Sequence, residues 1–218
     1  MSIDSQPDFD QIAAGWYSFR HHTIFKKELT ELSARWKTGK LLNAGCGHGA
    51  DFLPFENTFD LYGIDISSEM LKFGEKFARK HTFKAELKQA DMRSIPYPDE
   101  CFDNAIVVAS LHHVKTRSGQ LKALAEIRRV LKPGGEAFVT VWNATQPRFF
   151  FTRRDTQIPW RQGADTILRY YHLFTYGEIQ RLAKSAGFDI IYCRPESRYN
   201  FPFKYFSRNI CLLLKKPS

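Results

Sequence analysis

The chain has 218 residues, of which 43% are hydrophobic and 25% charged, and its formal net charge is +9. This balance suits one α/β domain spanning residues 1–218, and no apolar run approaches the ~20 residues that cross a membrane. The four cysteines form no C-x-x-C pair, which argues against a bound metal and, with an acidic N-terminus unlike a targeting peptide, favours the cytoplasm.

The first predicted strand, residues 40–42, runs into a glycine-rich turn. Gly45, Gly47 and Gly49 follow at a spacing of two, which leaves bare backbone where a large polar ligand can approach. A second apolar run ends in Asp65. A glycine turn after one strand and an acid after the next hold the ribose hydroxyls of a nucleoside. A glycine turn by itself also occurs as a tight turn without a ligand.

The glycine spacing discriminates between cofactors. A dinucleotide fingerprint reads G-x-G-x-x-G, whereas this chain reads G-x-G-x-G, and the helix predicted to begin at Ala50 carries Asp51 in its first turn. An acid there repels a pyrophosphate and suits a cationic ligand. The pattern therefore favours S-adenosylmethionine, which has a sulfonium and no phosphate, over NAD.

Further elements follow in alternation. Strands are predicted over residues 85–90, 102–109, 136–142 and 210–214, and a helix over 121–131 that Pro133 and Gly134 terminate. Asp91 closes the third strand and suits the adenine amino group. Ser110 and two histidines close the fourth strand.

The combination resembles the class I S-adenosylmethionine-dependent methyltransferases over about residues 10–218. The resemblance implies a doubly wound, mostly parallel seven-stranded sheet with helices on both faces. The residues that it assigns to the cofactor are Asn43, Gly45, Cys46, Gly47, Gly49, Asp65, Ile66, Met70, Asp91, Met92 and Ser110.

Eight of the nine excess positive charges fall in residues 143–218, interleaved with aromatics at 149–154, 169–172, 198–201 and 203–206. Basic groups neutralise phosphates and aromatic faces stack unpaired bases, so the pattern suits RNA with exposed bases. Arg153, Arg154 and Arg169 are the predicted contacts. A solvated basic face is the alternative interpretation.

The substrate is expected beyond the ends of the fourth and fifth strands, because ligands bind at the carboxyl ends of parallel strands. Residues 144–170 form too long a connection for an ordinary loop, and such loops are commonly binding lids. We therefore predict a substrate-binding insertion at 144–172 and an N-terminal helical segment, 1–38, that covers the site.

Residues 170–174 with the following 177–179, and the segment 158–160, are similar to the tRNA wobble-uridine carboxymethyl methyltransferases, which esterify 5-carboxymethyluridine in the anticodon loop. This resemblance implies a catalytic set of Arg20, His113, Trp142, Tyr171 and His172. Arg208 and Asn209, which we also assign to substrate or RNA binding, fall where the family has an Asn-Trp pair, but Ile210 replaces the tryptophan. The resemblance also implies a small zinc-binding activator subunit beside the third strand, residues 82–90, with Phe83 and Leu87 as apolar contacts.

A carboxymethyl group has a pKa of roughly 4 and is anionic at neutral pH, so it needs no general base. Arg20 with His113 or His172 would hold it by charge-assisted hydrogen bonds, while Trp142 or Tyr171 stacks on the uracil. Of the adjacent His112 and His113, at most one faces the cofactor.

Two other functions remain open at this point. One is a small-molecule O-methyltransferase acting on a quinone or phenol, with His113 as general base. The other is a non-catalytic RNA-binding module that kept the fold. The C-terminal charge argues against the first, and the acids Asp65 and Asp91 argue against the second.

Overall fold

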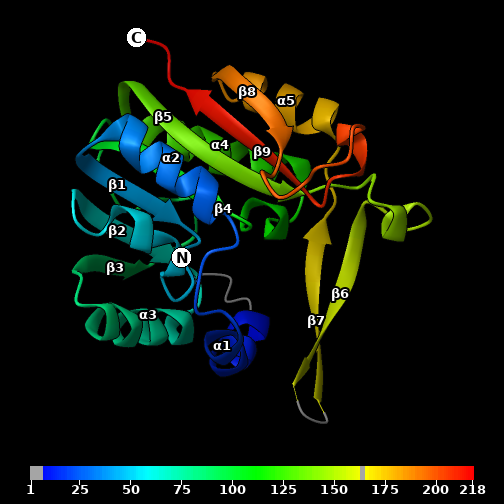
Figure 1. Ribbon diagram of the computed structural model, residues 1–218, viewed down its shortest axis with the longest axis horizontal. Coiled ribbons are helices and arrows are strands. Elements are labelled where there is room, and N and C mark those ends of the chain that lie inside the picture. The colour runs from blue at the N-terminus through cyan, green and yellow to red at the C-terminus, as the bar shows by residue number, and fades with distance from the viewer. Residues whose placement is uncertain (1–6, 163–164) are drawn as a thin grey trace.

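The computed structural model describes residues 7–162 and 165–218. Seven strands form one sheet in the order β3-β2-β1-β4-β5-β9-β8 (Figure 1). Neighbouring strands are parallel except at β9, which is antiparallel to both β5 and β8. The predicted doubly wound, mostly parallel seven-stranded sheet is confirmed. Its strands are β1 (Gly39–Ala44), β2 (Phe59–Asp65), β3 (Ala85–Gln89), β4 (Phe102–Val108), β5 (Leu131–Trp142), β8 (Asp189–Pro195) and β9 (Asn209–Lys215).

The central strand β1 contributes to two cores, one on each face of the sheet. Successive side chains of a strand point to opposite faces, so Leu42 packs in one core and Leu41 in the other, and neither is exposed to solvent. Burying a leucine side chain stabilises the fold by about 2 kcal/mol.

Helices cover both faces. On the side of Leu42 lie α4 (Arg117–Val130) and α5 (Tyr176–Ser185), and on the side of Leu41 lie α2 (Lys26–Trp36) and α3 (Ser68–His81). The helix predicted from Ala50 is instead a 3₁₀ helix, η1 (Ala50–Phe55). Pro54 lies inside it and has no N–H to extend an α-helical ladder. The remaining 3₁₀ turns are η2 (Leu111–His113), η3 (Pro147–Phe149) and η4 (Lys204–Phe206).

Two boundaries differ from the prediction around α4. The helix begins four residues early, at Arg117, because the Thr116 hydroxyl accepts the backbone N–H of Gly119 and caps it. The predicted terminator, residues 132–135, lies within β5 where its register on β4 shifts, so the chain passes from helix to strand without an intervening loop.

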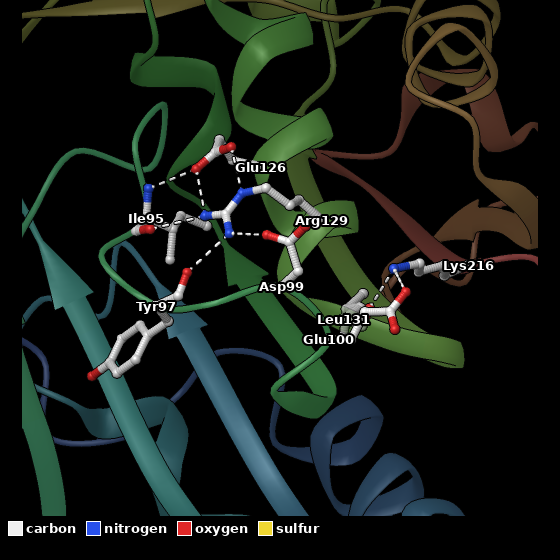
Figure 2. Close-up of polar contacts among 8 residues, drawn as sticks. All are labelled: Ile95, Tyr97, Asp99, Glu100, Glu126, Arg129, Leu131 and Lys216. Atoms are coloured by element: carbon white, nitrogen blue, oxygen red, sulfur yellow. Dashed lines mark hydrogen bonds and ion pairs between the residues drawn. The ribbon is translucent and has the colours of Figure 1, made fainter.

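Arg129 on α4 ties the loop between β3 and β4 to the helix (Figure 2). Its guanidinium bonds the carboxylates of Glu126 and Asp99 and the carbonyl oxygens of Ile95 and Tyr97, at 2.7 to 2.9 Å. Glu126 in turn accepts the N–H of Ile95 at 2.9 Å. These contacts fix the segment that follows Asp91.

A second, two-stranded sheet stands apart from the first. Its strands β6 (Asp155–Gln162) and β7 (Asp165–His172) pair antiparallel and project away from the main sheet (Figure 1). The insertion predicted as a long loop is thus largely a hairpin, whose alternating exposed and covered residues on β6 are those of a strand. Residues 163–164 of this insertion lie outside the described residues.

The N-terminal helix α1 (Pro7–Phe19) packs between α3 and the hairpin (Figure 1). Ile12 and Ala13 are buried against Met70 of α3, and Trp16 lies 5.6 Å from Trp160 of β6, centroid to centroid. Residues 1–6 of the predicted N-terminal segment lie outside the described residues.

β3 is an edge strand of the main sheet, as expected for residues 82–90. Phe83 and Leu87, expected to be available to a partner, pack inward instead. Phe83 is buried beside Phe52 and Phe77, and Leu87 packs against Gly63. Their apolar surface already belongs to the core, so a partner at this edge would meet backbone groups and polar side chains. Within 7–162 and 165–218, no helix combines the length and apolarity needed to cross a bilayer.

Candidate functional site

A cavity of about 440 Å³ opens at the carboxyl ends of β1, β2 and β4, beneath α1 and beside β7. This volume lies in the range of small-molecule sites. Of the residues predicted to bind the cofactor, those that line it are Gly45, Cys46, Gly47, Asp65, Ile66, Met70, Asp91, Met92 and Ser110.

The glycine loop presents bare backbone to the cavity. Gly45 and Gly47 have φ of 76° and 53°, in the left-handed region that favours glycine. A Cβ on Gly45 would lie 2.4 Å from Cβ of Ser110, whose hydroxyl donates to the carbonyl oxygen of Ala44. Gly49 and Asn43 lie outside the lining; Asn43 is fully buried on β1. Of the three glycines of the loop, only Gly45 and Gly47 therefore line the cavity.

Asp65 ends β2 at the floor of the cavity. Its carboxylate accepts the N–H of Gly47 at 2.8 Å and of Ser67 at 3.0 Å. Burial raises its pKa, the two N–H bonds oppose that rise, and nearby Asp10 adds to it. Asp10 belongs to α1 and accepts the Ser67 hydroxyl at 2.6 Å, which fastens α1 to the start of α3.

Asp91 lies two residues after the end of β3 and also lines the cavity. Arg93 binds it through three bonds of 2.5 to 2.8 Å, one from its backbone and two from its guanidinium. The carboxylate expected to take an adenine amino group is thus already held in a fixed orientation. Cys46, between the two glycines, is buried, and burial raises the pKa of its thiol, which stays neutral.

Arg20 reaches the cavity from the end of α1. Its Nη2 donates to Oδ1 of Asp51 at 3.5 Å, and its guanidinium lies 5.3 Å from the centroid of Trp16. Asp51, expected to face a cationic ligand, thus already has a cationic partner. Phe9, Ile12, Trp16 and Arg20 together form one wall. Their spacing of three and four residues is that of one helix face, a signal that sequence reasoning missed.

Arg169 on β7 is a buried cation in the site. It is 6% exposed, and among residues 7–162 and 165–218 no carboxylate lies within ion-pair distance and its Nε has no hydrogen-bond partner. The rings of Trp160 and Tyr171 each lie 5.2 Å from the guanidinium, and burial lowers its pKa. A buried guanidinium without an anion is costly, so this position is prepared for an anionic ligand.

His113 lines the cavity next to Arg169. Its Nδ1 lies 2.8 Å from the carbonyl oxygen of Tyr170, which can only accept, so Nδ1 carries the hydrogen. Burial, together with Arg169, lowers its pKa to about 3. His113 is therefore neutral at pH 7 and cannot supply the charge-assisted bond expected of it. The neighbouring His112 is buried and stacked on Tyr171 at 5.0 Å, so one histidine of the pair is structural, as predicted.

Trp142 and Tyr171 lie behind the cavity wall and do not line it. Their ring centroids are 4.4 Å apart, and Tyr171, 3% exposed, lies 4.4 Å from His113. They support the wall from behind, and neither is placed to stack on a ligand in the cavity.

His172 lies outside the cavity, contrary to the expectation of a catalytic role. It bonds Asp155 and Glu178, each at 2.9 Å. Burial would lower its pKa, but the bonds to these two carboxylates raise it above its usual value. The carboxylates of Asp155 at the start of β6 and of Glu178 on α5 hold the imidazole at this position.

The residues predicted to contact RNA also lie partly inside and partly outside the cavity. Arg169 lies in the cavity, whereas Arg153, Arg154, Arg208 and Asn209 lie outside it. Arg154 bonds Glu178 at 3.1 Å, and Asn209 is a buried residue of β9. Arg153 and Arg208 are exposed. Across the described ranges, 7–162 and 165–218, no group of three or more potential ligand residues could hold a metal ion.

Comparisons with known proteins agree with this geometry. The family described as "Methyltransferase domain" matches residues 42–139. A protein of Encephalitozoon cuniculi named "Putative methyltransferase" is 30% identical over 69% of this chain and 70% of its own length. The tRNA (carboxymethyluridine(34)-5-O)-methyltransferases of Arabidopsis thaliana and Schizosaccharomyces pombe are 38% and 27% identical, over 49% and 69% of this chain.

The match spans 24% of the Arabidopsis protein and 73% of the Schizosaccharomyces protein. Among solved structures, a S-adenosylmethionine-dependent methyltransferase from Clostridium acetobutylicum superposes with a TM-score of 0.76 at 16% identity, over 96% of this chain and 99% of its own. A methyltransferase solved in complex with the Haloferax volcanii Trm112 activator has a TM-score of 0.68 at 17% identity, over 96% and 98%. These structures share the fold.

Proposed function

We propose that this chain, which belongs to the class I S-adenosylmethionine-dependent methyltransferases, methylates the carboxylate of 5-carboxymethyluridine at the wobble position of tRNA. The family supplies the reaction class, and the names of the Arabidopsis and Schizosaccharomyces relatives support the substrate. The arrangement of charges in the cavity supports an anionic acceptor.

The residues of the cavity fit S-adenosylmethionine. A Cβ at Gly47 would meet only Nε1 of Trp16, at 3.9 Å, so the backbone there is open to a ligand. Asp65 is held by two N–H groups at the position that suits ribose hydroxyls. Residues that would hold it are Gly45, Gly47, Asp65, Asp91 and Met92. When bound, it supplies the methyl group as an electrophilic sulfonium.

Arg169 is the observation that carries the assignment of the acceptor. A cation in the cavity repels a sulfonium and attracts a carboxylate, and this guanidinium has no protein anion to neutralise it within the described residues. Its role is to hold the acceptor carboxylate in line with the methyl group. Positioning of this kind is worth several kcal/mol of activation free energy.

The state of His113 separates this function from the small-molecule alternative. A phenol or quinol must lose a proton, and a base with a pKa of about 3 removes it poorly at pH 7. A carboxylate has no proton to lose at that pH. The neutral His113 therefore favours an acceptor that is already ionised.

We also infer an activator subunit that pairs with the exposed edge of β3, since an open edge strand is usually covered. The Haloferax structure supports this, because its methyltransferase of the same fold binds an activator. With Phe83 and Leu87 packed inward, the contact would be mainly backbone pairing. Co-expression of the chain with such an activator would raise its soluble yield; an equal yield without the activator counts against the inference.

Methyl transfer to tRNA from a strain lacking the enzyme tests the function, with mass spectrometry of the digested nucleosides. The expected product is the methyl ester of 5-carboxymethyluridine, and no further methyl transfer is expected to tRNA that is already esterified. Methylation of a small phenol in place of tRNA would overturn the proposal. Binding of S-adenosylmethionine by calorimetry separates an enzyme from a non-catalytic RNA-binding module, for which no binding is expected.

A further inference from the structure

Six exposed aromatic side chains gather outside the cavity and form what we call the aromatic platform. They come from two segments far apart in the sequence, the turn after η3 and the loop between β8 and β9. In Figure 1 the turn after η3 is yellow-green and the loop between β8 and β9 is orange-red. The ring centroids of Phe150 and Phe206 are 6.1 Å apart, and those of Phe201 and Phe203 are 5.8 Å apart. The platform comprises Phe150, Phe151, Phe201, Phe203, Tyr205 and Phe206, whose exposed fractions run from 39% to 104%.

The backbone beneath these rings is held firmly. Asn143, at the end of β5, donates through Nδ2 to the carbonyl oxygens of Tyr205 and Ser207 at 2.7 and 2.8 Å. The hydroxyls of Tyr176 and Tyr199 donate to the carbonyl oxygens of Lys204 and Phe203 at 3.1 and 2.7 Å. A loop whose backbone is held by the buried side chains of Asn143 and Tyr176, with its rings in solvent, is prearranged to contact a partner.

The charge around the rings is of one sign. Residues 144–154 and 197–208 contain six arginines and lysines and no aspartate or glutamate. Lys204 lies 5.6 Å from the ring of Tyr205, and Arg148 lies 4.4 Å from that of Phe149. Cations interleaved with exposed rings suit a polyanion that has flat apolar faces, which describes single-stranded RNA.

The platform is also continuous with the wall of the cavity. Phe149, which precedes Phe150, lies 6.1 Å from Trp142, and Trp142 contacts Tyr171, which contacts His113 at the cavity. A nucleic acid with one nucleotide in the cavity would therefore carry its neighbouring nucleotides toward the platform.

We propose that the aromatic platform binds the unpaired bases that flank the target nucleotide of an RNA substrate. The identity of that RNA rests on the proposed function. The binding itself does not, because stacking on the platform requires no methyl transfer.

Fluorescence anisotropy tests this with two labelled probes, an anticodon stem-loop and a single-stranded oligouridylate. Phe151→Ala and Phe203→Ala should each weaken binding of both probes by about tenfold, since a stacked base contributes 1–3 kcal/mol. Phe203→Trp, which keeps an aromatic ring at this position, should bind both probes as tightly as the wild type does. Ile191→Ala, which removes an exposed apolar side chain on β8, should leave binding unchanged. Calorimetry with S-adenosylmethionine should give the same affinity for every variant, which shows that the fold is intact.

Arg198→Ala and Lys204→Ala should each reduce the slope of log affinity against log salt by about 0.7, the value for one phosphate contact of a single strand. If the wild type binds neither probe, or if the phenylalanine variants bind as tightly as the wild type, the proposal is wrong. Light scattering adds a further check: a wild-type dimer that Phe151→Ala dissociates, with RNA affinity unchanged, would make the platform a protein contact. A wild type that fails to methylate tRNA while its platform variants lose RNA affinity would overturn the proposed function alone.

Discussion

Arg20, which follows α1, forms an ion pair of 3.5 Å with Asp51 of η1, and each side chain is about one-tenth exposed. Both residues line the cavity, so the pair neutralises an acid of its wall.

The coupling between Arg20 and Asp51 should be measurable. A double-mutant cycle with Arg20→Ala and Asp51→Ala, followed by urea unfolding, should give a coupling free energy of about 1 kcal/mol or more, because the pair is largely shielded from water. The same cycle on Lys72 and Glu69, an exposed pair at 2.5 Å, should give less than about 0.5 kcal/mol. Equal couplings in the two cycles would show that burial does not strengthen the pair.

Arg169→Met should separate stability from activity. Removing a buried guanidinium that lacks a protein anion should raise the free energy of unfolding by about 1–2 kcal/mol. It should also lower kcat/KM for tRNA by about 100-fold, with the affinity for S-adenosylmethionine retained. Arg194→Met, at a half-exposed arginine paired with Glu31, serves as the control and should change neither. A variant that is less stable and fully active would contradict the role assigned to Arg169.

His172 should stabilise the protein in a pH-dependent manner. Its folded-state pKa is raised, so its contribution is complete below its unfolded pKa of 6.5 and is lost as the pH rises through the folded value. The pKa values of Asp155 and Glu178 are lowered in the folded state. The stability that these two carboxylates contribute is therefore complete above their unfolded pKa values and is lost as the pH falls through their folded values.

Urea unfolding of the wild type and of His172→Gln at pH 6 and pH 9 measures this effect. The wild type should exceed the variant by about 1–2 kcal/mol at pH 6, the strength of a bond to a charged group, and by less at pH 9. A difference that is equal at both pH values would show that His172 acts without its charge.

Arg129→Leu should destabilise the fold by about 2–3 kcal/mol, because it leaves two carbonyl oxygens and two carboxylates without their donor (Figure 2). The affinity for S-adenosylmethionine should also fall, since the loop that Arg129 holds follows Asp91. Lys122→Leu, at an exposed position of the same helix, is the matched control for thermal unfolding. If Arg129→Leu unfolds at the same temperature as Lys122→Leu, the network does not have the stabilising role assigned to it.

The sequence was sufficient to bring most of the residues expected to bind the cofactor to one cavity, because their placement is local. Gly45, Gly47 and Asp65 follow strand ends, and parallel strands bring their carboxyl ends to one edge by geometry alone. The edge position of β3 was expected from the family resemblance, and the structure places β3 there.

The substrate side was harder to predict because it depends on tertiary pairing. Arg169 reaches the cavity only because β6 and β7 form a hairpin that packs on α1, a contact between segments about 150 residues apart. Trp142, Tyr171 and His172 were assigned by resemblance, and the structure places the first two behind the wall and the third outside it. No pattern in one sequence shows that a ring lies behind a wall and not in front of it.

The hairpin of β6 and β7 pairs with none of the seven strands of the main sheet. Its length and side chains can therefore change without shifting the register that orders the glycine loop and Asp65. Arg169, proposed to hold the acceptor, belongs to this separable element, whereas the residues proposed to bind the nucleoside lie at strand ends of the main sheet. Under this proposal, acceptor choice and donor binding are open to independent evolutionary change, and exchange of the hairpin between related chains offers a direct route to altered acceptors.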